Sequence, residues 1–136
     1  MLPNTLLALF ERDLLKVIHE LELYTDESNI WKVVPGSTNT AGNLALHLVG
    51  NLNTYIGKEI GQIAYVRVRD LEFSQKGISR DVLVDQLKDT LLRLKTSLPL
   101  LADQDLTKVY PLIVLEEETT FEYFLVHLFG HLNYHL

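Results

Sequence analysis

Apolar residues recur every three or four positions in four long segments, the spacing of helices that each bury one face. The segments run from Pro3 to about Tyr24, from the Ser37–Thr40 region to about Ile60, from Ser79 to Pro99, and from Thr119 or Thr120 onward. Ser79 and the two threonines are residue types that cap helix N-termini, and proline ends or bends a helix. The predicted core stripes are Leu7, Phe10, Leu14, Val17, Leu21 and Tyr24; Leu44, Leu48, Leu52, Tyr55 and Ile56; Leu83, Leu87, Leu91, Leu94 and Leu98; and Phe121, Phe124, Leu125, Leu128 and Leu132.

Two long connections, residues 62–77 and 102–120, interrupt the helical pattern, and each has some extended character. Four long amphipathic helices predict an all-α fold, for which a four-helix bundle with long connections is the economical packing. A chain of 136 residues suits a single domain covering 1–136.

Composition narrows the class of protein. Hydrophobic residues make up 47% of the chain, too many for a disordered protein, yet polar residues interrupt every apolar run before it reaches membrane-spanning length. The first sixteen residues lack the basic region and cleavage site of a secretory signal, so a cytoplasmic location is expected. A net charge of -6 without a basic block argues against nucleic-acid binding. Cysteine is absent, so any metal site must use nitrogen and oxygen ligands.

Histidines are concentrated at one end of the sequence. His127, His131 and His135 follow one another at steps of four, so neighbours in this series share a helical face. Two such imidazoles can bind one ion, each at about 2.0–2.1 Å. The first and third cannot readily share an ion, because eight residues span about 12 Å of helix. A further ligand is therefore expected from another helix.

His47 is the candidate for that ligand. It lies one position off the second stripe, in a polar strip that continues a turn before and after it through Thr40, Asn43, Asn51 and Thr54. Amide neighbours of this kind can orient a metal ligand or bind water. Three imidazoles would leave positions open on a divalent ion, as in catalytic rather than structural sites. The alternative is a set of histidines at a helix edge or on the surface, and His19 is expected to face solvent.

No accompanying base stands out in the sequence, so no catalytic residue is assigned. Glu116, Glu117 and Glu118 are expected to form a solvated loop, and Tyr55 and Tyr134 are expected to serve packing, although both could reach the site.

Two stretches, "NLALHLVGNLNTYIG" around His47 and "HLFGHLNYHL" around His131 and His135, resemble motifs of the DinB-like (YfiT-like) superfamily. The last family motif typically reads H-x-x-x-H-x-G-Q, whereas this sequence stops at Leu136 without the Gly-Gln pair. We therefore expect a last helix that is either truncated or lacks the usual tail. By residue, His47, His131 and His135 match the family's histidine triad, and His127 is an additional histidine.

The resemblance implies a four-helix bundle with a three-histidine site for a divalent metal, often nickel or zinc, and frequently a homodimer. It also implies chemistry on small molecules, such as thiol-dependent S-transfer or hydrolysis. The sequence leaves open a non-catalytic bundle that holds metal or a small ligand, and an interaction domain without metal.

Extra apolar residues independently favour a homodimer. They make the first and third helices apolar over a wider part of their circumference than one buried face requires. The additional apolar surface would be buried by a second copy of the chain. The residues are Leu6, Leu9, Leu15, Ile18 and Leu23 in the first helix, and Val82, Val84 and Leu92 in the third.

Overall fold

A computed structural model describes residues 2–33, 35 and 39–135, and within these residues the protein is helical and has no strand. The all-α prediction is therefore confirmed. The α-helices are α1 (Leu2–Glu22), α2 (Ala41–Leu52), α3 (Arg69–Ser74), α4 (Arg80–Ser97) and α5 (Phe121–His135). A π-helical turn (Asn53–Lys58) extends α2, and short 3-10 turns cover Glu27–Trp31, Leu98–Leu100 and Asp103–Thr107.

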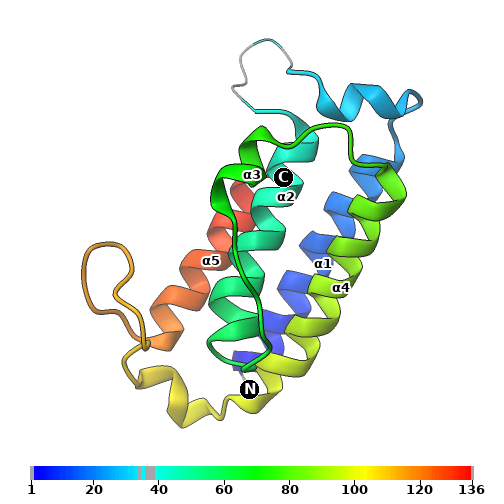
Figure 1. The fold of residues 1–136 in the computed structure, drawn as a ribbon. Coiled ribbons are helices and arrows are strands. Elements are labelled where there is room, and N and C mark those ends of the chain that lie inside the picture. The colour runs from blue at the N-terminus through cyan, green and yellow to red at the C-terminus, as the bar shows by residue number, and fades with distance from the viewer. Residues whose placement is uncertain (1, 34, 36–38, 136) are drawn as a thin grey trace.

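The four long helices lie alongside one another and enclose a common core, while α3 lies against α2 (Figure 1). α1 packs on α4 and α5, and α2 packs on α4. Side-chain caps are present at three helix starts: the hydroxyls of Thr40, Ser79 and Thr120 each accept a hydrogen bond from the backbone N–H three residues further on. The caps at Ser79 and Thr120 were predicted. None of the described helices is both long and apolar enough to cross a membrane.

The predicted stripes supply most of the core. Every predicted residue of the third stripe is buried, as are four of the five in the last. In α1, Leu6 is buried in the core, whereas the predicted Leu7 is only partly buried. Tyr24, which follows the end of α1, is also partly buried. In α2, Leu44 is likewise partly buried, because α2 turns Asn43 and His47 inward beside it.

The second helix departs from its predicted form. Its α-helical part ends at Leu52 rather than near Ile60, and the chain continues as a π-helical turn. The Asn53 amide donates to the Val49 carbonyl at 2.8 Å and to the Thr90 hydroxyl of α4 at 2.9 Å. These bonds hold the widened turn against α4, a contact that local periodicity cannot reveal. The predicted helix start at Ser37 and Thr38 lies outside the described residues.

The first long connection contains a helix that the hydrophobic pattern does not predict. Residues 62–68 form neither helix nor strand, and α3 follows. The Asn43 side chain, buried on α2, donates to the carbonyl oxygens of Glu72 at 3.0 Å and Gln75 at 2.8 Å. The amide thus fixes the end of α3 on α2, and a six-residue helix needs such external support because short helices are marginal alone.

Candidate metal centre

Three imidazoles from two helices converge at one end of α5. The Nε2 atom of His131 lies 3.1 Å from Nε2 of His47 and 3.1 Å from Nε2 of His135. One ligand atom from each residue lies within 4.8 Å of the other two. Two nitrogens that are each 2.0–2.1 Å from one ion are about 3.0–3.4 Å apart, so the spacing suits a shared metal.

Helix geometry produces this convergence. His131 and His135 are one turn apart on α5, so both imidazoles leave the same face. Leu128 and Leu132 are buried and fix the rotation of α5 against the core. On α2, His47 belongs to the inward-facing polar strip, and it meets a helix that begins more than seventy residues later.

The donor set fits a divalent cation better than a network of neutral imidazoles. Nδ1 of His47 faces the Glu72 carboxylate, which only accepts hydrogen bonds, so Nδ1 carries the proton and Nε2 presents a lone pair. His131 Nε2 has one proton or one lone pair to share between two nitrogens at equal distance. The three nitrogens therefore cannot all be well paired with one another, whereas a cation would accept all three lone pairs.

Glu72 is the functional residue that the sequence interpretation missed. Its Oε1 atom is 3.0 Å from His47 Nδ1, and its side chain is almost fully buried. Arg67 holds the same carboxylate by two hydrogen bonds, Nε to Oε2 at 2.7 Å and Nη2 to Oε1 at 3.0 Å. A carboxylate behind a histidine fixes its tautomer and ring orientation and makes it a more basic ligand. The one feature of the sequence that could have pointed to Glu72 is its position as an acidic residue between the apolar Leu71 and Phe73.

Gly50 makes room for this carboxylate. A β-carbon at Gly50 would overlap the Glu72 carboxylate and come within 3.2 Å of Arg67 Nε. The group that approaches Gly50 this closely is the side chain that supports His47.

The surroundings of His131 and His135 disfavour the charged form of each imidazole. Burial lowers the pKa of His131 to about 4, with further lowering by His135, His47, His127 and Arg67. Burial, followed by the effect of His47, also lowers the pKa of His135. Neutral imidazole is the form that binds metal, so these environments favour binding near neutral pH.

The other candidates lie outside the triad. His127 is exposed one turn before His131, and His19 is exposed on α1. The three glutamates at 116–118 are exposed in a loop, as predicted. Tyr134 is 84% exposed, whereas Tyr55 is partly buried and lines a cavity beside the triad.

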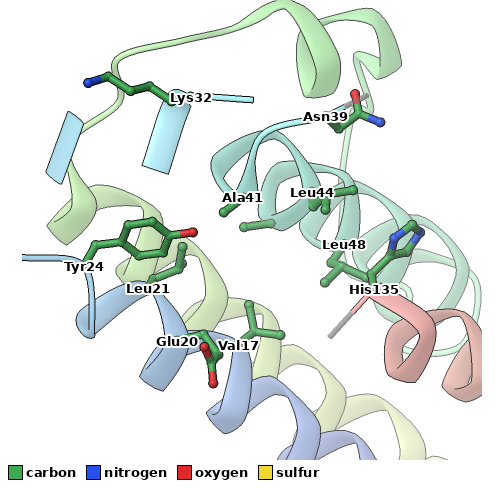
Figure 2. Close-up of a pocket in the computed structure, with 11 residues that line it drawn as sticks. Val17, Glu20, Leu21, Tyr24, Lys32, Asn39, Ala41, Leu44, Leu48 and His135 are labelled. Carbon is green, nitrogen blue, oxygen red and sulfur yellow. The ribbon is translucent and has the colours of Figure 1, made fainter. Parts of the chain in front are cut away.

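That cavity, hereafter the basic cavity, is defined by His47, His131, Asn51, Arg67, Arg69 and His127 and has a volume of about 340 Å³. A second cavity of about 220 Å³ is lined by His135 of the triad, which lies opposite Tyr24 across it (Figure 2). Residues of the histidine cluster therefore border two cavities.

Comparison of the chain with protein-family models, with curated proteins and with solved structures finds no match in any of the three.

Proposed function

We propose that this protein is a divalent-metal-dependent enzyme that acts on a small molecule at the His47, His131 and His135 site. The observation that carries the proposal is the convergence of three Nε2 atoms at metal-ligand spacing, with a buried carboxylate behind one of them. Three protein ligands would leave positions for water or a substrate thiol on a nickel or zinc ion, which would lower the pKa of the bound group.

The chain's own residues would perform three tasks in this scheme. Arg67 and Glu72 hold the His47 ring in the ligating tautomer. The buried side chains of Leu128 and Leu132 fix the rotation of α5, so that His131 faces His47. The basic cavity leaves His47 and His131 accessible to a substrate.

The proposal includes the finer features that the resemblance implies: a four-helix bundle of the DinB-like type, a homodimer, and a cytoplasmic location. The side-by-side arrangement of α1, α2, α4 and α5 supports the first of these. A small thiol is the substrate class favoured by the resemblance.

The first experiment is metal analysis of protein purified without a histidine tag. About one nickel or zinc ion per chain, lost on treatment with a chelator, is the expected result. A screen of thiols with electrophilic partners, and of hydrolysable esters and amides, then tests turnover. Metal-free protein that stays metal-free after incubation with nickel and with zinc would contradict the proposal.

A second function, metal or ligand binding without turnover, is favoured by one specific observation. Among the described residues, neither Asp nor Glu lines the basic cavity, so no carboxylate stands ready as a general base. Stoichiometric metal together with no turnover in the screen would support this alternative.

A further inference from the structure

The basic cavity differs in charge from the molecule as a whole. The chain has a net charge of -6, yet the described lining of this cavity contains two arginines and no acidic residue. His127 adds an imidazole at the same surface. In contrast, the cavity beside His135 has both Glu20 and Lys32 in its lining and so has no clear preference for one sign of charge.

The two arginines have different roles. Arg67 is occupied, because two of its nitrogens bind the Glu72 carboxylate. Arg69 is exposed and makes no recorded hydrogen bond or ion pair within the described part of the chain. Its guanidinium is therefore free to bind a ligand. A guanidinium presents a planar fork of donors that matches a carboxylate bidentately.

Asn51 provides a second, independent indication of a ligand. It lies one turn after His47, is 8% exposed, and lines the basic cavity. Its Oδ1 atom is buried and has no hydrogen-bond partner. Buried polar atoms are normally paired, because an unpaired acceptor loses its hydration without replacement. A ligand N–H or O–H would supply the missing donor once a turn of the Asn51 side chain brings Oδ1 to the cavity wall.

We propose that the basic cavity binds a small carboxylate-bearing molecule, whose carboxylate pairs with Arg69 and whose N–H or O–H group donates to Asn51 Oδ1. This inference rests on the proposed function, since it names the substrate class of the same site. The bound molecule would lie beside His47 and His131, and the apolar side chains of Ile113, Phe124 and Leu128 would contact its hydrocarbon part. The volume of about 340 Å³ is that of a small-molecule site.

Two probes that differ only in the carboxylate test this assignment. N-acetylcysteine and N-acetylcysteamine share a thiol and an amide N–H, and only the former carries a carboxylate. Each is titrated into cobalt-loaded protein, and binding is followed through the thiolate-to-cobalt absorption band. We expect N-acetylcysteine to bind about tenfold more tightly, as one charge-assisted bidentate contact would give.

Variants separate Arg69 from general charge effects. Arg69→Gln should remove the preference for N-acetylcysteine, and Arg69→Lys should retain part of it. Lys88→Gln, which removes an exposed charge of the same sign on α4 outside the cavity lining, should leave the preference unchanged. Asn51→Leu should weaken both probes several-fold and equally, because both donate the same N–H. Circular dichroism checks that each variant is folded.

A metal-free arm keeps the two proposals distinguishable. Chelator-treated protein, titrated with the same probes and followed by NMR chemical shifts, should still prefer N-acetylcysteine in an Arg69-dependent manner. Failure to bind cobalt, nickel or zinc would overturn the metal site and leave this arm to decide the carboxylate site. Equal affinities for the two probes in both arms, or a preference that survives Arg69→Gln, would overturn the carboxylate site.

Discussion

At the scale of single residues, histidines with the same spacing in the sequence are expected to differ in their contribution to metal binding. His47 and His135 each contribute one nitrogen to the cluster, whereas His127 is exposed and is not part of it. We expect His47→Ala and His135→Ala to lower metal content sharply and His127→Ala to change it little, measured by mass spectrometry of tag-free protein. If His127→Ala lost its metal and His135→Ala kept it, the second ligand on α5 would be His127 and not His135.

Acid should destabilise the metal-free protein through His131. Its pKa is about 4 in the folded protein and about 6.5 in an unfolded chain, so the unfolded state binds more protons between these values. Stability should therefore fall as pH decreases from about 6.5 toward 4. Urea unfolding midpoints across this range provide the measurement. His131→Asn should flatten the dependence, whereas His19→Gln, at an exposed position, should not.

At the scale of elements, α3 and Gly50 form one unit with His47. Gly50→Ala should displace the Glu72 carboxylate, because a β-carbon would overlap it, and should weaken metal binding by about 10–100-fold. Gly130→Ala is the matched control: it lies in α5 next to His131 but has open space around it. That variant should keep its metal and gain up to about 1 kcal/mol of stability. Equal metal affinities in the two variants would mean that Glu72 does not support the site.

Sequence patterns predicted the long helices, the caps at Ser79 and Thr120, and the shared face of His131 and His135 because each depends on local spacing. His47 was chosen from its polar strip and from the family resemblance. Leu83 to Leu98 repeat at helical steps, and Ser79 precedes them directly. The pattern did not predict α3, because a helix of six residues is too short to show a repeat of apolar positions. This helix is also held by Asn43, some thirty residues earlier in the chain, and such a contact leaves no local signal. Glu72 was missed for the same reason: its partner His47 is 25 residues away, and nothing local marks the pair.

At the scale of the whole molecule, the apolar residues outside the predicted stripes form two groups, apart from Leu9, which is partly buried. Leu6, Ile18 and Val84 are buried within the chain, so part of the excess that suggested a dimer has an intramolecular explanation. Leu15 and Leu92, in contrast, are 47% and 61% exposed, and Leu23 and Val82 are similarly open.

These exposed side chains keep the homodimer as a prediction. Light scattering at micromolar concentration should give twice the monomer mass of 15.6 kDa. Leu15→Glu or Leu92→Glu should shift the mass toward the monomer without unfolding, because each places a charge where a partner helix would pack. A monomeric wild-type protein, with both variants equally folded, would rule out this interface.

The contact between Nε2 of His47 and Nε2 of His131 joins positions 84 residues apart. The two residues lie on helices α2 and α5, which make few other contacts with each other. An ion held there would act as a reversible crosslink, and the thermal midpoint of the protein would become a function of free metal concentration. Because the complete site exists only in the folded chain, a free concentration one hundred times Kd should add about 2.7 kcal/mol of stability. Calorimetry across a series of buffered nickel or zinc concentrations should show the midpoint rising with the logarithm of metal, and a His47→Ala variant should lose most of that slope. The fraction of unfolded protein would then depend on the concentration of free metal around it.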